Sequence, residues 1–328
     1  MATRPALTQA VQLLGQTRPA VSERLASTLE LLLAGNSRST VPQEAWRYGM
    51  LNGNGCPVEF NFTSLGNDLR YTVELTEPNI PPNQRLIRAK KLLEQLAPQQ
   101  LCNDEVARLM QMQAGDCLSW GGWLGVRHRV EGDRFKIYAE VPRARAAVID
   151  DWARQTLGSR TAPANRFALP VAIGHELGSD REEIYYYINR SGLSYRFIQS
   201  LLQQLGLAEQ EEALLDLIQG ALGITEQRII PSFPEANYGF SISLCAKGGP
   251  PVLSIFAYTS RFIGDDATVR RHVLSLARRH GWALSDYAAL SAPLARNGRS
   301  DFHNVMAFIV APNMPPQLHI SMSPPEAA

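Results

Sequence analysis

The stretch PVEFNFTSLGNDLRYTVEL, residues 57–75, indicates what kind of fold this chain adopts. Val58, Phe60 and Phe62 lie on one face of its first half, and polar residues lie on the other. The second half alternates in the same way after a turn-rich SLGND, so the stretch predicts an antiparallel hairpin with one apolar and one polar face. Strands of a parallel sheet are nearly continuous apolar runs, which argues against a doubly wound sheet or a parallel barrel.

Four further hairpins are predicted along the chain, each joined by a short, turn-rich connection. They pair 118–129 with 134–141, 166–176 with 183–189, 238–245 with 252–259, and 303–311 with 317–323. Helical patterns separate the hairpins, at 83–97, 143–157, 194–205, 209–222 and 266–280, after a helical lead-in over about 1–50. A repeated helix-and-hairpin unit predicts one domain over 1–328 rather than two unrelated ones.

Ten strands with one apolar face need helices on that face and leave two sheet edges to protect. Closure into a barrel removes both edges, so we expect an α+β fold with a ten-stranded antiparallel barrel ringed by helices. Such a barrel is wider than the eight-stranded kind that side chains can fill, which predicts a polar interior chamber. The alternative is an open antiparallel sheet with a solvated polar face.

Composition and charge exclude several classes of protein. The 328 residues are 45% hydrophobic, as in globular proteins, and the net charge of +1 argues against a strongly basic nucleic-acid binder. No apolar run reaches the roughly 18–20 residues of a membrane span, and the N-terminus lacks the apolar core of a signal peptide. The four cysteines are scattered, which favours reduced thiols over disulfides or zinc. We therefore expect a cytoplasmic protein that binds neither membranes nor nucleic acid.

The pattern resembles the ABBA prenyltransferase fold, or PT barrel, which is built from repeated α-β-β-α units. Its residues resemble the dimethylallyltryptophan-synthase-like branch, the indole prenyltransferases, in a compact bacterial or cyanobacterial form. Gly55-Cys56-Pro57-Val58-Glu59 is similar to that family's G-x-P-x-E strand, and Arg70 follows eleven residues later, as the family's diphosphate-binding Arg does. RFKIY, residues 134–138, is similar to the family's K-x-Y strand, and REEIY, residues 181–185, stands where R-x-K-x-Y is expected.

The resemblance implies a role for each matching residue. Glu59 would be the catalytic group and would accept a hydrogen bond from an indole N–H. The other implied roles are diphosphate binding by Arg70, Lys136, Arg134 and Arg181, shielding of an allylic cation by Tyr138, Tyr185, Tyr187 and Tyr258, and stacking of Trp123 on the acceptor. Purely structural roles are the alternative: Glu59 as a solvated carboxylate, or Arg70 paired with Glu59 or Glu74.

The chain departs from the family pattern at two places. Glu183 stands where the family usually has Lys, which puts one diphosphate contact in doubt. The last two hairpins have fewer tyrosines than the corresponding hairpins of the family. They carry Ser254, Phe256, Tyr258, His319 and Ser321 instead.

The resemblance implies a transferase that moves a dimethylallyl or longer prenyl group from an allylic diphosphate to an indole-containing small molecule. The alternatives are a phenol or a cyclic-peptide side chain as acceptor, or a barrel that binds a small aromatic molecule without catalysis. No D-D-x-x-D box is present, since neither Asp150-Asp151 nor Asp265-Asp266 is followed by a third carboxylate on the same helix face. We therefore expect no required cofactor and activity without Mg²⁺, in a monomer or homodimer.

Overall fold

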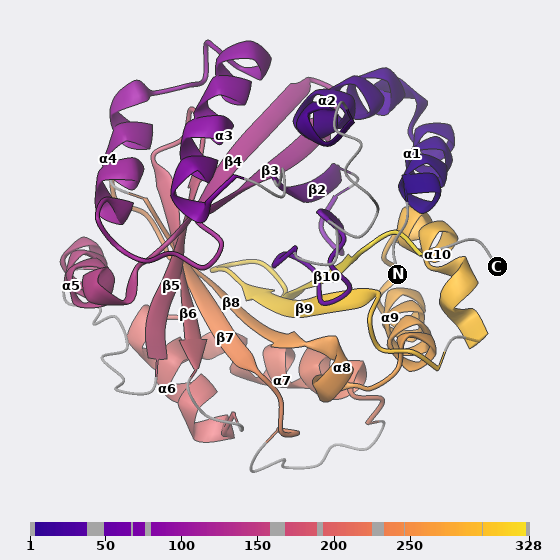
Figure 1. Cartoon of the computed structure of the whole chain (residues 1–328). Helices are drawn as coiled ribbons and strands as arrows, with labels where there is room; N and C mark the ends of the chain where they lie inside the picture. The colour runs from indigo at the N-terminus through magenta and orange to yellow at the C-terminus, as the bar shows by residue number, and fades with distance from the viewer. Residues whose placement is uncertain are drawn as a thin grey trace.

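The computed structural model describes residues 4–37, 49–66, 68–75, 80–157, 168–188, 193–224, 233–245, 247–296 and 298–325. Strands occupy the middle of the molecule (Figure 1). They are β1 (Val58–Thr63), β2 (Leu69–Glu74), β3 (Gly122–Arg129), β4 (Gly132–Glu140), β5 (Ala168–Glu176), β6 (Arg181–Ile188), β7 (Tyr238–Cys245), β8 (Val252–Tyr258), β9 (His303–Val310) and β10 (Gln317–Met322). The hairpins predicted from the alternation are confirmed, with ends that shift by a few residues. The predicted strand residues 166, 167 and 189 lie outside the described residues.

The strands form one closed antiparallel barrel. Each strand pairs with its neighbour in sequence, and β1 pairs with β10 to complete the ring. At this closure Phe60 lies opposite Met322, and Thr63 lies opposite His319. Closure gives each strand a partner on both sides, which removes the two edges that an open sheet would expose. The predicted barrel is therefore confirmed, and the open sheet is wrong.

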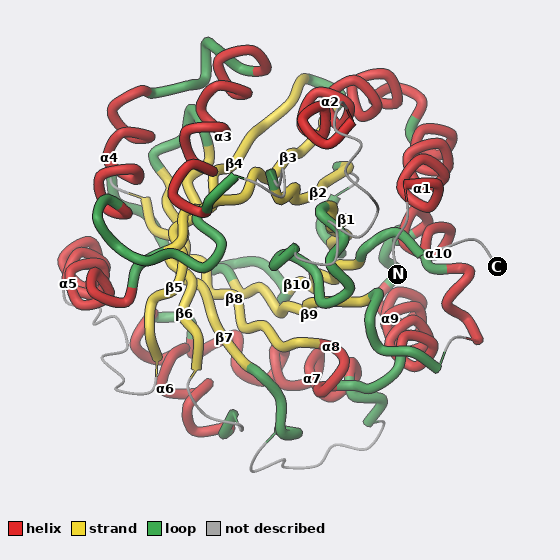
Figure 2. Tube along the Cα trace, viewed as in Figure 1, coloured by secondary structure: helices red, strands yellow, loops and turns green. Residues whose placement is uncertain are grey.

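Helices surround the barrel on its outside (Figure 2). They are α1 (Arg4–Thr17), α2 (Pro19–Ser37), α3 (Pro82–Leu96), α4 (Asn103–Gln113), α5 (Ala146–Leu157), α6 (Tyr195–Leu205), α7 (Glu211–Ala221), α8 (Thr259–Phe262), α9 (Asp266–His280) and α10 (Ser285–Leu290). Among the described residues, no helix is long and apolar enough to cross a bilayer.

The sequence pattern misses α4, α10 and the four-residue α8, and it does not place the break between α1 and α2. The buried residues of α4 include Gln113, so its apolar stripe is weak, and α10 has only six residues. The break follows from Pro19, which has no N–H to donate and disfavours helical geometry at Arg18. The predicted N-terminal lead-in is otherwise helical up to Ser37, and residues 38–48 lie outside the described residues.

The outer face of the barrel is apolar and packs against the helices. Val58 and Phe60 on β1 and Ile137 on β4 are completely buried members of the main hydrophobic core. Tyr186 points outward as the alternation predicts, and it stacks on Phe240 with ring centroids 4.7 Å apart. The polar residues of the same strands therefore line the inside of the barrel.

The two ends of the barrel are built differently. All five hairpin turns lie at one end, here named the hairpin end, because each hairpin joins two consecutive antiparallel strands. The connections that contain helices reach the strands at the opposite end, here named the helix end. The position of a residue along its strand therefore determines the end to which its side chain belongs.

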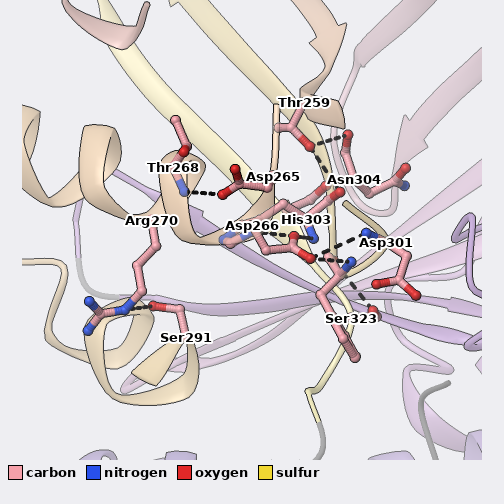
Figure 3. A network of polar contacts seen from close by, with 12 residues as sticks. Thr259, Asp265, Asp266, Thr268, Arg270, Ser291, Asp301, His303, Asn304 and Ser323 are labelled. Carbon is pink, nitrogen blue, oxygen red and sulfur yellow. Dashed lines mark hydrogen bonds and ion pairs between the residues drawn. The ribbon is translucent and has the colours of Figure 1, made fainter. Parts of the chain in front are cut away.

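A buried network of hydrogen bonds connects α9 to the start of β9 (Figure 3). The Asp266 carboxylate accepts hydrogen bonds from the backbone N–H groups of Asp301, Phe302 and His303, at 3.3, 3.3 and 2.8 Å. His303 Nδ1 lies 2.8 Å from the same carboxylate, and Nε2 lies 2.9 Å from the Tyr287 hydroxyl. The network thereby holds the first residues of β9, which lie at the helix end of the barrel.

Candidate active site

Glu59 lies inside the barrel on β1, close to the helix end, with only 8% of its surface exposed. The amide of Asn304, on β9, donates a hydrogen bond to Glu59 Oε2, and Ser321 on β10 also contacts the carboxyl group. Burial raises the pKa of Glu59 to about 7, although both of these hydrogen bonds favour its ionised form. A carboxyl group with such a pKa can take up or release a proton near neutral pH.

Asn304 and Ser321 are site residues that the motifs do not reveal. They lie some 250 positions from Glu59 in sequence and reach it only because β1 closes against β10. The backbone carbonyls of His303 and Asn304 accept hydrogen bonds from Thr259 Oγ1 at 2.9 and 3.3 Å, within the network of Figure 3. The anchoring of α9 and β9 therefore also positions the amide that contacts Glu59.

Arg70 lies inside the barrel on β2, close to the hairpin end. Its Nη2 lies 3.4 Å from Asp68 Oδ2, so its partner is neither Glu59 nor Glu74. Glu74 instead binds Arg85, at 2.6 Å, and the backbone N–H groups of Met50 and Leu51. Burial lowers the pKa of Arg70, and the nearby positive charges of other arginines lower it further.

Lys136 on β4 forms a partly buried ion pair with Glu183 on β6, the residue that departs from the family pattern. The ammonium group also donates to the Tyr185 hydroxyl at 3.1 Å and lies 4.9 Å from the Tyr138 ring centroid. Burial lowers the pKa of Lys136, but the Glu183 carboxylate outweighs it and holds this pKa above its ordinary value. In this arrangement the positive charge of Lys136 is already neutralised.

A glycine makes this ion pair possible. Gly174 lies on β5 between the strands of the two partners, and a Cβ there would stand 2.4 Å from Lys136 Cε and 3.0 Å from Nζ. The Lys136 side chain therefore crosses β5 through space that any other residue would fill. This glycine marks a close approach of side chains, not a turn.

Arg134 and Arg181 both belong to the hairpin end, but they do not reach the Lys136–Glu183 pair. Arg134 is exposed, and its guanidinium lies near Gly178 in the β5–β6 turn. Arg181 donates to Ser243 Oγ at 3.3 Å and to the carbonyl of Pro250 at 3.3 Å, across the β7–β8 hairpin. Their diphosphate-binding role stays a prediction.

The four tyrosines expected to form one shield lie in two groups. Tyr138 and Tyr185 are neighbours in the barrel interior, with ring centroids 5.8 Å apart, and Phe256 continues the group 6.3 Å from Tyr185. Tyr187 and Tyr258 lie at the helix end and are 37% and 41% exposed. The first group surrounds the Lys136 ammonium, and the second is nearer to Glu59, whose charge raises the pKa of Tyr258 after the larger effect of burial.

Trp123 lies on the inner face of β3, opposite Tyr138 on β4. Its ring stacks on Trp120 with centroids 4.0 Å apart and an interplanar angle of 21°. Its Nε1–H is buried without a hydrogen-bond partner in the described part of the chain. One face of the indole is therefore covered by protein, and stacking of the other face on an acceptor stays a prediction.

His319 is a neutral imidazole in the same interior. Its Nε2 lies 3.1 Å from Asn61 Oδ1, and Asn61 Nδ2 donates to Thr72 Oγ1 and to the carbonyl of Glu59. Because the Asn61 amide nitrogen is engaged, its oxygen accepts from Nε2–H and leaves His319 Nδ1 unprotonated. Burial lowers the pKa of His319 to about 4, and the Arg70 charge lowers it further.

The barrel interior thus has three levels. Arginines occupy the hairpin end, the Lys136–Glu183 pair with its tyrosines occupies the middle, and Glu59 occupies the helix end. Asn61 stands opposite Arg70 and two residues from Glu59, so roughly 7 Å of strand separates the levels of these two side chains. Among the residues that the structure describes, no group of three or more His, Cys, Asp or Glu side chains could hold a metal ion.

Comparison with solved structures shows the fold. The 5-dimethylallyltryptophan synthase from Streptomyces coelicolor superimposes with a TM-score of 0.76 at 16% identity, covering 97% of this chain and 96% of that one. The prenyltransferase PriB gives a TM-score of 0.76 at 18% identity, covering 98% and 97%. The 6-dimethylallyltryptophan synthase from Micromonospora olivasterospora, in complex with DMASPP and Trp, gives 0.64 at 17% identity, covering 92% and 97%. No family model matches the sequence, and no curated protein does.

Over nearly its full length, the chain therefore has the ABBA or PT-barrel fold of these prenyltransferases, as the sequence resemblance implies. PriB has been crystallised with L-tryptophan and dimethylallyl thiolodiphosphate together, so one barrel of this fold holds both ligands at once.

Proposed function

We propose that this chain is an aromatic prenyltransferase, which transfers an allylic group from its diphosphate to an electron-rich aromatic ring. The observation that supports this most is the polarity of the barrel interior, with arginines at one end and a carboxyl group of raised pKa at the other. Tyrosine rings lie between them. The reaction needs these three environments in this order along one path.

The first task is to hold the leaving group. The C–O bond of the allylic diphosphate breaks and its electron pair leaves with the diphosphate, so cations must stabilise the departing charge. Arg70 can do so with paired N–H donors directed at phosphate oxygens. Lys136 can contribute only to the extent that phosphate competes with Glu183 for its ammonium group.

The second task is to protect the allylic cation until the ring attacks it. The Lys136 ammonium lies 4.9 and 5.4 Å from the ring centroids of Tyr138 and Tyr185, a placement that supports this role for the two rings. Each aromatic face contributes ~0.5–2 kcal/mol of cation–π attraction and offers no nucleophile at its centre. Phe256 extends this surface in place of a further tyrosine.

The third task is to orient the acceptor and take up its proton. A ring carbon forms the new C–C bond, positive charge spreads over the ring, and the ring then loses a proton. Ionised Glu59 would accept a hydrogen bond from an indole N–H and so stabilise this charge, and its carboxylate would then take up the released proton. Asn304 and Ser321 hold the carboxylate in place.

Incubation with dimethylallyl diphosphate and a panel of acceptors tests the proposal. The panel contains tryptophan and other indoles, a phenol and a cyclic peptide, each with Mg²⁺ and with a chelator. We expect an acceptor one dimethylallyl unit heavier, formed also in the chelated reaction, and mass spectrometry of the products checks this. If only the phenol or the peptide is alkylated, the indole specificity is wrong.

The absence of product with every acceptor, together with binding of an aromatic compound, would favour the non-catalytic barrel. The cytoplasmic location and the monomeric or dimeric state stay predictions, which fractionation of cells and light scattering would test.

A further inference from the structure

The hairpin end of the barrel contains a cluster of arginines larger than the motifs indicate. Arg70 on β2 lies directly opposite Arg127 on β3, and Arg129 follows on the same face of β3. All three guanidinium groups face Asp68: Arg127 forms an ion pair with its Oδ2, Arg70 lies 3.4 Å from it and Arg129 lies 3.5 Å from it. We name these four residues the arginine cluster.

The arginine cluster has more positive charge than its own carboxylate can balance. Like charges placed directly opposite each other on two strands destabilise a sheet, so the pairing of Arg70 with Arg127 costs free energy. Asp68 supplies one negative charge against three guanidinium groups. An excess of two positive charges therefore remains for an anion to neutralise.

Hydrogen-bond donors in the cluster are also unused. The Nε–H groups of Arg70 and Arg129 are buried, and neither makes a hydrogen bond among the described residues, although Arg129 Nε lies 3.5 Å from Asp68 Oδ2. A buried donor without an acceptor costs free energy that a ligand oxygen would recover. The side chains of Arg70, Arg127 and Arg129 still keep 25%, 29% and 33% of their surface exposed, so an anion can reach them.

The other interior cation offers a poorer anion site. Lys136 is already paired with Glu183, whose negative charge repels a phosphate group. Glu183 also accepts a hydrogen bond from Ser241, which holds the carboxylate in the barrel. The charge distribution thus favours the hairpin end over the middle of the barrel as the place for a polyanion.

We propose that Arg127, together with Arg70 and Arg129, binds the diphosphate of the donor directly, so that the arginine cluster is its main anchor in this chain. This inference rests on the proposed function for the identity of the ligand. Arginine suits the role because its planar guanidinium gives two parallel hydrogen bonds to phosphate oxygens. The allylic carbon chain would then extend from the hairpin end toward Tyr138 and Tyr185.

Calorimetric titration of the full-length protein with inorganic pyrophosphate tests the inference, with inorganic phosphate as a second ligand. We expect Arg127→Gln to weaken pyrophosphate binding on the order of 10- to 100-fold. The matched control is Arg154→Gln, which removes an arginine that pairs with Asp150 on the outer helix α5. We expect less than about a 2-fold effect from this control, because exposed charges are screened by salt.

Two further measurements separate binding from folding. Arg127→Lys keeps the charge but loses the paired donors, so we expect an affinity between those of the wild type and Arg127→Gln. Thermal unfolding of each variant shows whether the fold is kept. If Arg127→Gln does not fold, the Arg127→Lys variant alone decides, and unchanged affinity in it overturns the inference.

The outcomes also distinguish this inference from the proposed function. Unchanged pyrophosphate affinity in folded Arg127→Gln overturns the role of Arg127 and leaves prenyl transfer untouched. Loss of affinity in Arg127→Gln without transfer to any acceptor supports the anion site and contradicts the proposed reaction. If the wild-type protein binds pyrophosphate no more tightly than phosphate, both are wrong.

Discussion

At the residue scale, the chemistry of the barrel depends on the charge states of a few buried side chains. Glu59 has a pKa of about 7 because it is buried, whereas Lys136 keeps its proton because Glu183 lies beside it. His319 is neutral at physiological pH because burial and Arg70 both oppose a second proton. Of these three groups, Glu59 is the one that titrates close to neutrality.

Glu59→Gln should lower the rate of prenyl transfer by roughly 100-fold or more, because the amide cannot act as a base. The pKa of Glu59 is raised, so the wild-type rate should rise with pH as the carboxyl group ionises around pH 7. The rising limb should be lost in Glu59→Gln, and kcat measured between pH 5 and 9 checks this. A variant that keeps both the wild-type rate and the pH profile would remove Glu59 from the mechanism.

Glu183→Gln should tighten the binding of pyrophosphate by about 10-fold, because it releases the positive charge of Lys136 and removes a negative charge from the interior. Calorimetry with pyrophosphate measures the change. The control is Asp216→Asn, which removes a carboxylate that pairs with Arg279 on the protein surface. Weaker binding in Glu183→Gln would mean that Glu183 serves to orient Lys136 rather than to neutralise it.

At the element scale, the start of β9 connects the helices to the site. Asp266 at the first position of α9 binds three backbone N–H groups and the His303 ring, while the next residue of the strand, Asn304, contacts Glu59. The neighbouring Asp265 caps the helix by accepting from the Thr268 N–H at 2.7 Å. Asp266 therefore binds the start of β9, whereas Asp265 caps its own helix.

Asp266→Asn should destabilise the protein by about 3 kcal/mol or more, because it removes a buried charge that four donors contact. Asp265→Asn should change stability by only a few tenths of a kcal/mol, since Asn caps helices about as well as Asp. Urea denaturation of both variants measures the difference. Equal effects at the two positions would contradict the separate roles given to them.

At the scale of the whole molecule, the barrel joins the two halves of the chain. Its closure pairs Val58–Thr63 near the start with Gln317–Met322 near the end. Consecutive strands are hydrogen-bonded to each other around the ring, and the main hydrophobic core lies between the ring and the helices. We propose that the described strands and helices form one cooperative unit; the single domain that the repeats predict stays a prediction.

Unfolding in urea should therefore occur in one transition, with the same midpoint by tryptophan fluorescence and by circular dichroism. A chain that ends at Pro316 lacks β10, so β1 and β9 would become open edges and the cooperative transition should be lost. Two separate transitions in the full-length protein, or cooperative unfolding of the shortened chain, would contradict a single domain.

The strands, their faces and the sides on which Glu59, Arg70, Lys136 and Tyr138 lie could all be predicted from the sequence. These are local properties, because a period of two residues places side chains on alternate faces of a strand whatever the strand later pairs with. The same alternation places Arg127 on the face of 118–129 that carries Trp123. Arg127 lies in no short motif, so the sequence does not mark it as a site residue.

Which charged side chains contact each other could not be predicted without the folded structure. The contact of Asn304 with Glu59, the pairing of Lys136 with Glu183 and the gathering of three arginines around Asp68 depend on strand register and on closure of the ring. Charges interact according to their distance in space and their burial, and the linear order of residues records neither. These contacts form because the strands close into a ring, which brings the first and last strands together.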